Sequence, residues 1–206
     1  MTMTAVEVEQ LKRAPATEGI MPEILNRWSP RSFSDRPVSA SDLRTVFEAA
    51  RWAASSNNEQ PWRFLVGRKG SDTYEKILSI LVERNQQWAR SAPVLILDAT
   101  RTKFVRNGSD NPVALYDAGA AAATLCYQAT ALGLHTHQMA GFDREAARKV
   151  FNLPPEFIWG AAMALGYLGE PSALTVPQML EQEVAPRQRK PLSEIVFSDW
   201  EKPAVF

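Results

Sequence analysis

Two neighbouring apolar segments in the middle of the chain restrict how it can fold. A strand buried on both faces is predicted over residues 93–99, where Pro93 to Leu97 form an unbroken apolar run. A long helix rich in small residues is predicted over residues 117–132, ending at Gly133. Small side chains permit close backbone approach, so this helix is suited to the core of a dimer as well as to that of a monomer.

Hydrophobic spacing, caps and prolines locate the other elements. Pro22 opens one helix and Pro30 ends it, because proline is tolerated at a first helical position and disfavours helix in the residue before it. Helices are predicted over residues 6–13, 21–28, 39–54, 72–89 and 143–151, and strands over residues 63–67, 135–139 and 159–168.

The chain is predicted to form one domain over residues 1–206, with an N-terminal helix or arm over residues 1–20. After Ser172 the sequence is broken repeatedly by prolines, yet several of its residues are apolar, among them Leu192, Ile195, Val196, Phe197, Trp200 and Phe206. An exposed tail would not carry so much apolar surface. Residues 172–206 are therefore predicted to form an extended arm that packs on another subunit.

Composition excludes several classes of function. Lys plus Arg and Asp plus Glu both number 23, so no nucleic-acid or membrane-surface partner is expected. The single cysteine, Cys126, excludes an intrachain disulfide and lies in an alanine-rich run, where a buried structural role is expected. The N-terminus does not read as a secretory signal, and no apolar run could span a bilayer, so a cytoplasmic protein is expected.

The segment from Ser55 to Trp62 concentrates polar side chains between a predicted helix and a predicted strand. It reads Ser-Ser-Asn-Asn-Glu-Gln-Pro-Trp. Hydroxyl and amide groups supply both hydrogen-bond donors and acceptors. This set suits a flat heterocycle with carbonyl and N–H edges better than it suits a metal ion or a peptide.

Two arginine pairs lie near opposite ends of the chain. In an extended segment Arg27, Ser29 and Arg31 point to one side, and Arg187 and Arg189 repeat that spacing between two prolines. Guanidinium forks match phosphate oxygens, so the four arginines could clamp a phosphate dianion. Either pair alone would more simply be solvated surface charge. Taken with the polar segment, the arginines point to a flavin mononucleotide (FMN) site.

Other ligand sites are disfavoured. Neither a Gly-x-Gly-x-x-Gly turn after a strand nor a Gly-Lys-Ser/Thr motif is present, which argues against a Rossmann site and a P-loop. His135 and His137 share one face of a predicted strand and could suggest a metal. Since no third His or Cys lies nearby, no metal site is expected.

Three motifs together resemble the nitroreductase family of FMN-dependent NAD(P)H oxidoreductases. They are Arg27-Trp28-Ser29-Pro30-Arg31-Ser32-Phe33, the segment from Ala54 to Phe64, and the segment from Gly133 to Phe142. The late basic pair before Pro191 and Leu192 also fits. The resemblance implies an α+β fold: a three-layer α/β/α sandwich with a central mixed sheet, in an intertwined homodimer with a swapped C-terminal arm.

The resemblance also implies roles for individual residues. Arg27, Ser29 and Arg31 would hold the phosphate and the pyrimidine edge of the flavin, joined at the phosphate by Arg187 and Arg189. The facing subunit would supply serines and an asparagine, and Gln60 would fix the ribityl chain or the ring. The backbone N–H of Ala140 or Gly141 would donate to flavin N5. The full set of expected FMN contacts is Arg27, Trp28, Ser29, Arg31, Ser55, Ser56, Asn58, Gln60, Gln138, Met139, Ala140, Gly141, Arg187 and Arg189.

The activity implied is hydride transfer from NAD(P)H through flavin N5 to a nitroaromatic, a quinone or a similar small acceptor, in a ping-pong cycle. No catalytic side chain is expected, because hydride transfer is the chemistry of the flavin. Two alternatives stay open at this point. One is a flavin store or sensor without efficient turnover, and the other is the same fold used for reductive dehalogenation or flavin fragmentation.

Overall fold

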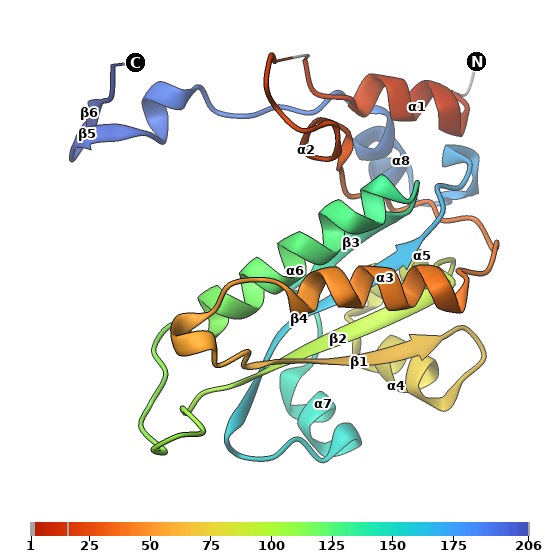
Figure 1. The fold of residues 1–206 in the computed structure, drawn as a ribbon. Helices are drawn as coiled ribbons and strands as arrows, with labels where there is room; N and C mark the ends of the chain where they lie inside the picture. Colours follow the sequence, from red (N-terminus) through yellow and green to blue (C-terminus); the bar gives the residue numbers. More distant parts are fainter. Residues whose placement is uncertain (1–2, 16, 206) are drawn as a thin grey trace.

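A four-stranded sheet lies between two layers of helices in the computed structural model, which describes residues 3–15 and 17–205 (Figure 1). The strands follow the spatial order β1-β2-β4-β3. They are β1 (Trp62–Arg68), β2 (Val94–Arg101), β3 (His135–Met139) and β4 (Phe157–Gly166). The helices are α1 (Ala5–Lys12), α2 (Pro22–Asn26), α3 (Ala40–Arg51), α4 (Asp72–Ile80), α5 (Glu83–Ala89), α6 (Ala114–Ala131), α7 (Arg144–Phe151) and α8 (Pro177–Val184). None of these helices has the length and apolarity needed to cross a lipid bilayer.

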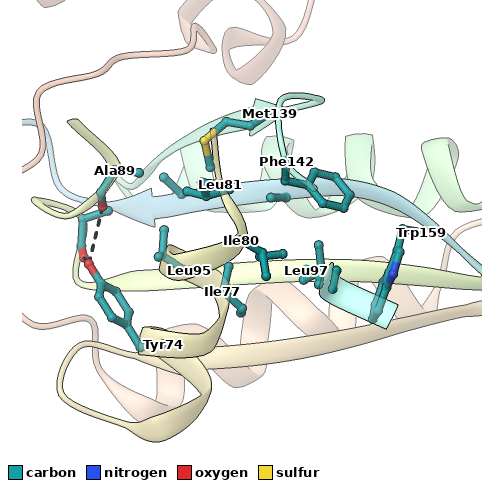
Figure 2. Close-up of a cluster of buried hydrophobic side chains, with 14 of the residues drawn as sticks. Tyr74, Ile77, Ile80, Leu81, Ala89, Leu95, Leu97, Met139, Phe142 and Trp159 are labelled. Carbon is teal, nitrogen blue, oxygen red and sulfur yellow. Dashed lines mark hydrogen bonds between the residues drawn. The ribbon is translucent and has the colours of Figure 1, made fainter. Parts of the chain in front are cut away.

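Strand β2 is the centre of the molecule, and its side chains alternate between two cores. Val94 and Ile96 pack in the cluster formed with α3 and α6. Leu95 and Leu97 pack on the opposite face, where Figure 2 shows them beside Ile77 and Ile80 of α4. Ala147 of α7 belongs to the same cluster. The strand is thus buried on both faces, which confirms the prediction and fixes the three-layer α+β architecture.

The expected mixed sheet is corrected by the strand pairing. Each pair of neighbours, β1–β2, β2–β4 and β4–β3, is antiparallel. Within the described residues no parallel pair exists in this sheet. The four strands alternate in direction across the sheet, so the sheet formed by the described residues is antiparallel and not mixed.

The single helix predicted over residues 72–89 is wrong, because the chain breaks at Leu81 and Val82 to give α4 and α5. Leu81 forms a bridge with Phe142, and the Val82 N–H donates to Gly141 O at 3.1 Å. The Leu81 N–H still donates to Leu78 O nearby, so the Val82 N–H is the one that turns to a distant acceptor. The apolar spacing continues across the break, so periodicity alone did not reveal it.

The C-terminal arm begins later than predicted. Residues 177–184 form α8, which packs on its own subunit and buries Met179 and Glu183. Beyond α8 the chain leaves the body as an extended segment (Figure 1) that ends in a hairpin of β5 (Phe197–Asp199) and β6 (Lys202–Pro203). This extended segment exposes large apolar side chains, with Trp200 85% exposed. Phe206 lies outside the described residues.

A buried carboxylate interrupts the pairing of β2 with β4. Between the pairs Leu97–Ala162 and Ala99–Trp159 the register shifts, and one residue of β2, Asp98, faces two residues of β4. Its Oδ1 accepts the N–H of Ala161 at 3.0 Å. Burial raises the pKa of Asp98 to about 6. A bulge of this kind needs a small residue opposite the carboxylate, and Gly160 fills that position.

Replacing Gly160 by alanine is expected to destabilise the fold by roughly 1–3 kcal/mol, as overpacking in a core does. A Cβ at this position would lie 1.7 Å from Asp98 Oδ1. Urea unfolding of Gly160→Ala measures the loss. Adding Asp98→Ala to the same chain should recover part of it, because the clashing atom is gone. Equal stability of Gly160→Ala and wild type would contradict this account of the bulge.

Candidate functional site

The polar segment and the Arg27–Arg31 segment lie at opposite ends of α6. The Ser56 N–H donates at 3.1 Å to Asp117 Oδ2, in the first turn of that helix. Pro30 O instead accepts from Nδ1 of His137, on the strand that follows the helix C-terminus. The 18 residues of α6 separate the two ends by roughly 27 Å at 1.5 Å per residue. A single chain therefore does not join its two sets of predicted ligands in one small site.

The polar segment is a tight turn with an unusual backbone. Asn57, Asn58 and Gln60 have φ values of 53°, 56° and 49°, in the left-handed region that is rare for residues other than glycine. The turn is closed by Ser55 Oγ, which accepts the Gln60 N–H at 3.0 Å. The Gln60 amide in turn donates to Asn58 Oδ1 at 3.1 Å. Backbone strain of this sort concentrates at functional sites, so the turn is a reasonable place for ligand contacts.

The Arg27–Arg31 segment alternates as an extended chain should. Trp28 and Pro30 are buried, whereas Ser29 is exposed and the two arginines are half-buried. Arg27 Nη1 donates to Ser29 Oγ at 3.2 Å. The predicted grouping of Arg27, Ser29 and Arg31 on one side is therefore present. Trp28 points to the interior, so only its backbone is available to a ligand on the arginine side.

A buried carboxylate that sequence inspection missed holds this segment in place. Glu183, at the end of α8, is 1% exposed. Both of its carboxylate oxygens lie 3.0 Å from the backbone nitrogen of Arg31 and accept its N–H. Oε1 also accepts the backbone N–H of Ser32 at 3.0 Å. Burial raises the pKa of Glu183, while the Ser32 and Arg31 N–H groups and the charges of Arg31 and Lys12 act to lower it. No spacing in the sequence links residue 183 to residue 31.

The second arginine pair meets the first through the backbone. Arg187 donates to Arg27 O and, at 2.7 Å, to Leu25 O. Arg189 makes only a 2.7 Å bond to its neighbour, Gln188 O. Burial and the positive charges of Arg27 and Arg189 lower the pKa of Arg187. The structure thus brings Arg187 and Arg189 to Arg27, but the Arg187 guanidinium is engaged by carbonyl groups.

None of these four arginines forms an ion pair with another of the described residues within 4.0 Å. Like charges collected in one place raise the electrostatic free energy of the folded chain unless an anion neutralises them. The arrangement therefore favours binding of a small, strongly charged anion such as a phosphate group.

The segment after β3 presents a backbone donor in a rigid turn. Gly141 O accepts from the Val82 N–H at 3.1 Å and from Asn85 Nδ2 at 3.0 Å. A Cβ on Gly141 would lie 2.8 Å from that amide nitrogen. The Gly141 N–H itself donates to no other group in the described part of the chain. Just before it, Gln138 and Ala140 are exposed, whereas the Met139 side chain is buried in the core and faces away from any ligand.

The two histidines are packed as neutral rings. His137 lies 4.5 Å from the Trp88 ring and His135 lies 5.9 Å from the Trp28 ring, both measured between centroids. Burial lowers the pKa of each histidine to about 4. Over residues 3–15 and 17–205, no three His, Cys, Asp or Glu side chains are grouped so that they could hold a metal ion.

Acidification from about pH 6.5 to 4 is expected to weaken the fold through these histidines. The unfolded imidazole binds its proton near pH 6.5, whereas the folded one binds only near pH 4, so the unfolded state takes up more protons in this window. Asp98 has a raised pKa in the folded protein, so its protonation favours the folded state as the pH falls and opposes the effect of the histidines. The test therefore compares the change in unfolding free energy between pH 7 and pH 5 in wild type with that in His135→Gln, both measured by urea unfolding. The variant should lose less stability, by roughly 1–3 kcal/mol. Equal losses would contradict the buried neutral state.

Residues 24–167 match the model of the nitroreductase family. An uncharacterized 15.4 kDa protein of Mycolicibacterium smegmatis is 35% identical over 152 residues, which cover 68% of this chain and 99% of the relative. The major NAD(P)H-flavin oxidoreductase of Aliivibrio fischeri is 28% identical over 46% of this chain and 44% of its own length.

A crystal structure of an oxidoreductase containing FMN superimposes with a TM-score of 0.82 at 33% identity, over 90% of this chain and 94% of that one. The family model thus matches more than half of this chain, and the superimposed fold agrees with it. This chain belongs to the nitroreductase family.

Proposed function

We propose that two copies of this chain bind FMN between them and pass hydride from NAD(P)H to a small organic acceptor. The observation that carries the proposal is a group of arginines, Arg27, Arg31, Arg187 and Arg189, whose guanidinium groups form no ion pair within 4.0 Å among the described residues. They lie on or beside the extended segment that holds Ser29, and the charge of the buried Glu183 acts on Arg31 alone among them. A phosphate dianion is the ligand that such a cluster accepts best. The FMN-containing relative supports this identity for the ligand.

The residues fit FMN as follows. Arg27, Ser29, Arg31 and Arg189 would bind the phosphate and the pyrimidine edge, and Arg187 would fix the backbone that carries Arg27. The Gly141 N–H, which is unbonded within the described chain, would donate to N5. When bound, FMN supplies hydride acceptance at N5 and hydride donation to the acceptor. Guanidinium groups near the pyrimidine edge would stabilise negative charge that develops there, and no side-chain acid or base is assigned.

The second copy is needed because α6, roughly 27 Å long, lies between the polar segment at its start and the Arg27–Arg31 segment near its end. In a dimer the Ser55, Ser56, Asn58 and Gln60 set of one copy would complete the site begun by the arginines of the other. Exposed apolar surface supports this arrangement. Tyr116 at the start of α6 is 80% exposed, and the C-terminal arm exposes Leu192, Ile195 and Trp200.

Initial-rate kinetics test the turnover. With NADH or NADPH as the donor and a quinone or a nitroaromatic as the acceptor, double-reciprocal plots should give parallel lines, because donor and acceptor occupy the same face of the flavin in turn. The NAD(P)H-flavin oxidoreductase among the relatives supports this donor class. Bound flavin without turnover would favour a store or a sensor, and intersecting lines would contradict the shared face.

Mixing two defective variants tests whether the site is built by two chains. Arg27→Ala with Arg189→Ala damages one half of each site, and Ser56→Ala with Asn58→Ala damages the other half. Each variant alone should be nearly inactive. After joint refolding, half of the dimers are mixed and each mixed dimer holds one intact site, so about a quarter of wild-type activity should return. No recovery would contradict a site shared between chains.

A further inference from the structure

Two members of the arginine cluster, Arg187 and Arg189, also line a hollow together with a third arginine, Arg13. This hollow of about 430 Å³ lies between the end of α1 and the start of the C-terminal arm. Its lining comprises Leu11, Arg13, Ala14, Pro15, Pro186, Arg187, Gln188 and Arg189. Three guanidinium-bearing residues therefore share one hollow, and among these lining residues there is no carboxylate.

Arg13 is held at this hollow by a well-fixed backbone. The Ala14 N–H donates at 2.9 Å to Leu25 O, the same carbonyl that Arg187 Nη2 contacts at 2.7 Å. One residue before Arg13, Lys12 Nζ donates to Gln182 O at 2.8 Å. The end of α1 is thus tied on both sides of Arg13 to the elements that carry the arginine cluster.

The charges in the hollow lack compensation. In the described chain the Arg13 guanidinium makes neither a hydrogen bond nor an ion pair, and the Arg189 guanidinium bonds only its neighbour's carbonyl. The pKa of Arg187 is lowered by burial and by the positive charges of Arg27 and Arg189. Prolines and Leu11 form the apolar wall around these charges. Such a hollow suits a doubly charged oxyanion attached to an organic group.

We propose that this hollow binds a phosphomonoester, and that Arg13, which directly follows α1, contributes a third guanidinium group to its binding beside those of Arg187 and Arg189. The proposal rests on the proposed function and deepens it, because two phosphomonoesters take part in that reaction. One is the 5′-phosphate of FMN, and the other is the 2′-phosphate that distinguishes NADPH from NADH. Arg13 comes from outside the motifs that identify the family, so the selectivity it confers would be a property of this chain.

Arg13→Ala and Arg13→Glu separate the two sources. The readouts are the dissociation constants of FMN and of riboflavin, which lacks the phosphate, and the KM values for NADPH and NADH. If the FMN phosphate occupies the hollow, Arg13→Ala should weaken FMN binding about 10-fold and leave riboflavin binding unchanged. If the NADPH phosphate occupies it, KM for NADPH should rise about 10-fold while KM for NADH stays constant. Arg13→Glu should enlarge whichever effect is seen.

Arg90→Ala is the matched control, since Arg90 is an exposed arginine at the end of α5 whose side chain bonds only Gln86 O. It should change none of the four constants. Unchanged constants in both Arg13 variants would overturn the inference. Arg189→Ala distinguishes this failure from failure of the proposed function. If Arg189→Ala weakens FMN binding and the Arg13 variants change none of the four constants, only the role of Arg13 is wrong.

Discussion

Arg27→Ala combined with Arg189→Ala is expected to give a protein that is purified without flavin. Each charge-assisted contact to a phosphate contributes about 1.5–3 kcal/mol. Loss of both should therefore raise the dissociation constant of FMN by roughly 10²- to 10⁴-fold. Arg189 is chosen over Arg187 because the Arg187 guanidinium bonds Arg27 O and Leu25 O, so its removal would also disturb the backbone.

Fluorescence titration with FMN measures this effect, and riboflavin provides the control. Riboflavin keeps the isoalloxazine ring and the ribityl chain but lacks the phosphate, so in the double variant its affinity should fall far less than that of FMN, by no more than the contact of Arg27 with the pyrimidine edge. Equal FMN affinity in the two proteins would show that the phosphate lies elsewhere. Equal loss for FMN and riboflavin would indicate a general disturbance of the site.

Glu183→Ala is expected to lower the free energy of unfolding by about 3–5 kcal/mol, the usual cost of breaking a buried charged network. The substitution leaves the N–H groups of Arg31 and Ser32 without their acceptor and removes the nearest opposite charge from the buried Lys12. FMN affinity should fall as well, because the backbone that positions Arg27 and Arg31 is released. Urea unfolding at pH 7 and fixed protein concentration gives the stability change.

Two variants separate the charge of Glu183 from its hydrogen bonds. Glu183→Gln keeps an acceptor for the two N–H groups and should cost only about 1 kcal/mol. Adding Lys12→Met to Glu183→Gln removes both charges at similar volume and should restore most of the remaining stability. If Glu183→Ala were as stable as wild type, the anchoring role of this carboxylate would be refuted.

Signals within a few residues of each other were sufficient to predict the bounds of several helices and strands. The strand over residues 135–139 was predicted with the bounds of β3, and the helix over residues 143–151 matches α7 with its cap at Asp143. In both cases a nearby signal marks the boundary: Gly133 ends the preceding helix, and the Asp143 side chain accepts the Ala146 N–H at 2.9 Å. Such contacts lie within a few residues, so the sequence contains them directly.

Features that depend on distant contacts could not be predicted in this way. The break at Val82 exists because Gly141 O accepts its N–H, 59 residues later along the printed sequence. Glu183 acts on Arg31 from the other end of the chain. The predicted phosphate role of Arg187 likewise ignored the carbonyl groups that reach its side chain only in the folded protein. Residue types identified the candidate ligands, but only the fold shows which side chains are already engaged.

In the candidate site, too, some features follow from nearby residues and others depend on distant contacts. Arg27, Ser29 and Arg31 could be grouped from their alternation alone, because extended geometry places every second residue on one side. The separation of this group from Ser55 and Asn58 depends on the length of α6 and on its neighbours at each end. The need for a second chain is therefore a consequence of topology and not of any motif.

The most direct measurement is the visible spectrum of the purified protein under anaerobic conditions, before and after addition of NADPH and, separately, NADH. The account predicts a bound flavin spectrum that bleaches on addition of at least one nicotinamide and returns when a quinone is added. A flavin that stays oxidised with both donors would contradict the oxidoreductase function. A colourless protein that takes up no added FMN would contradict the site itself.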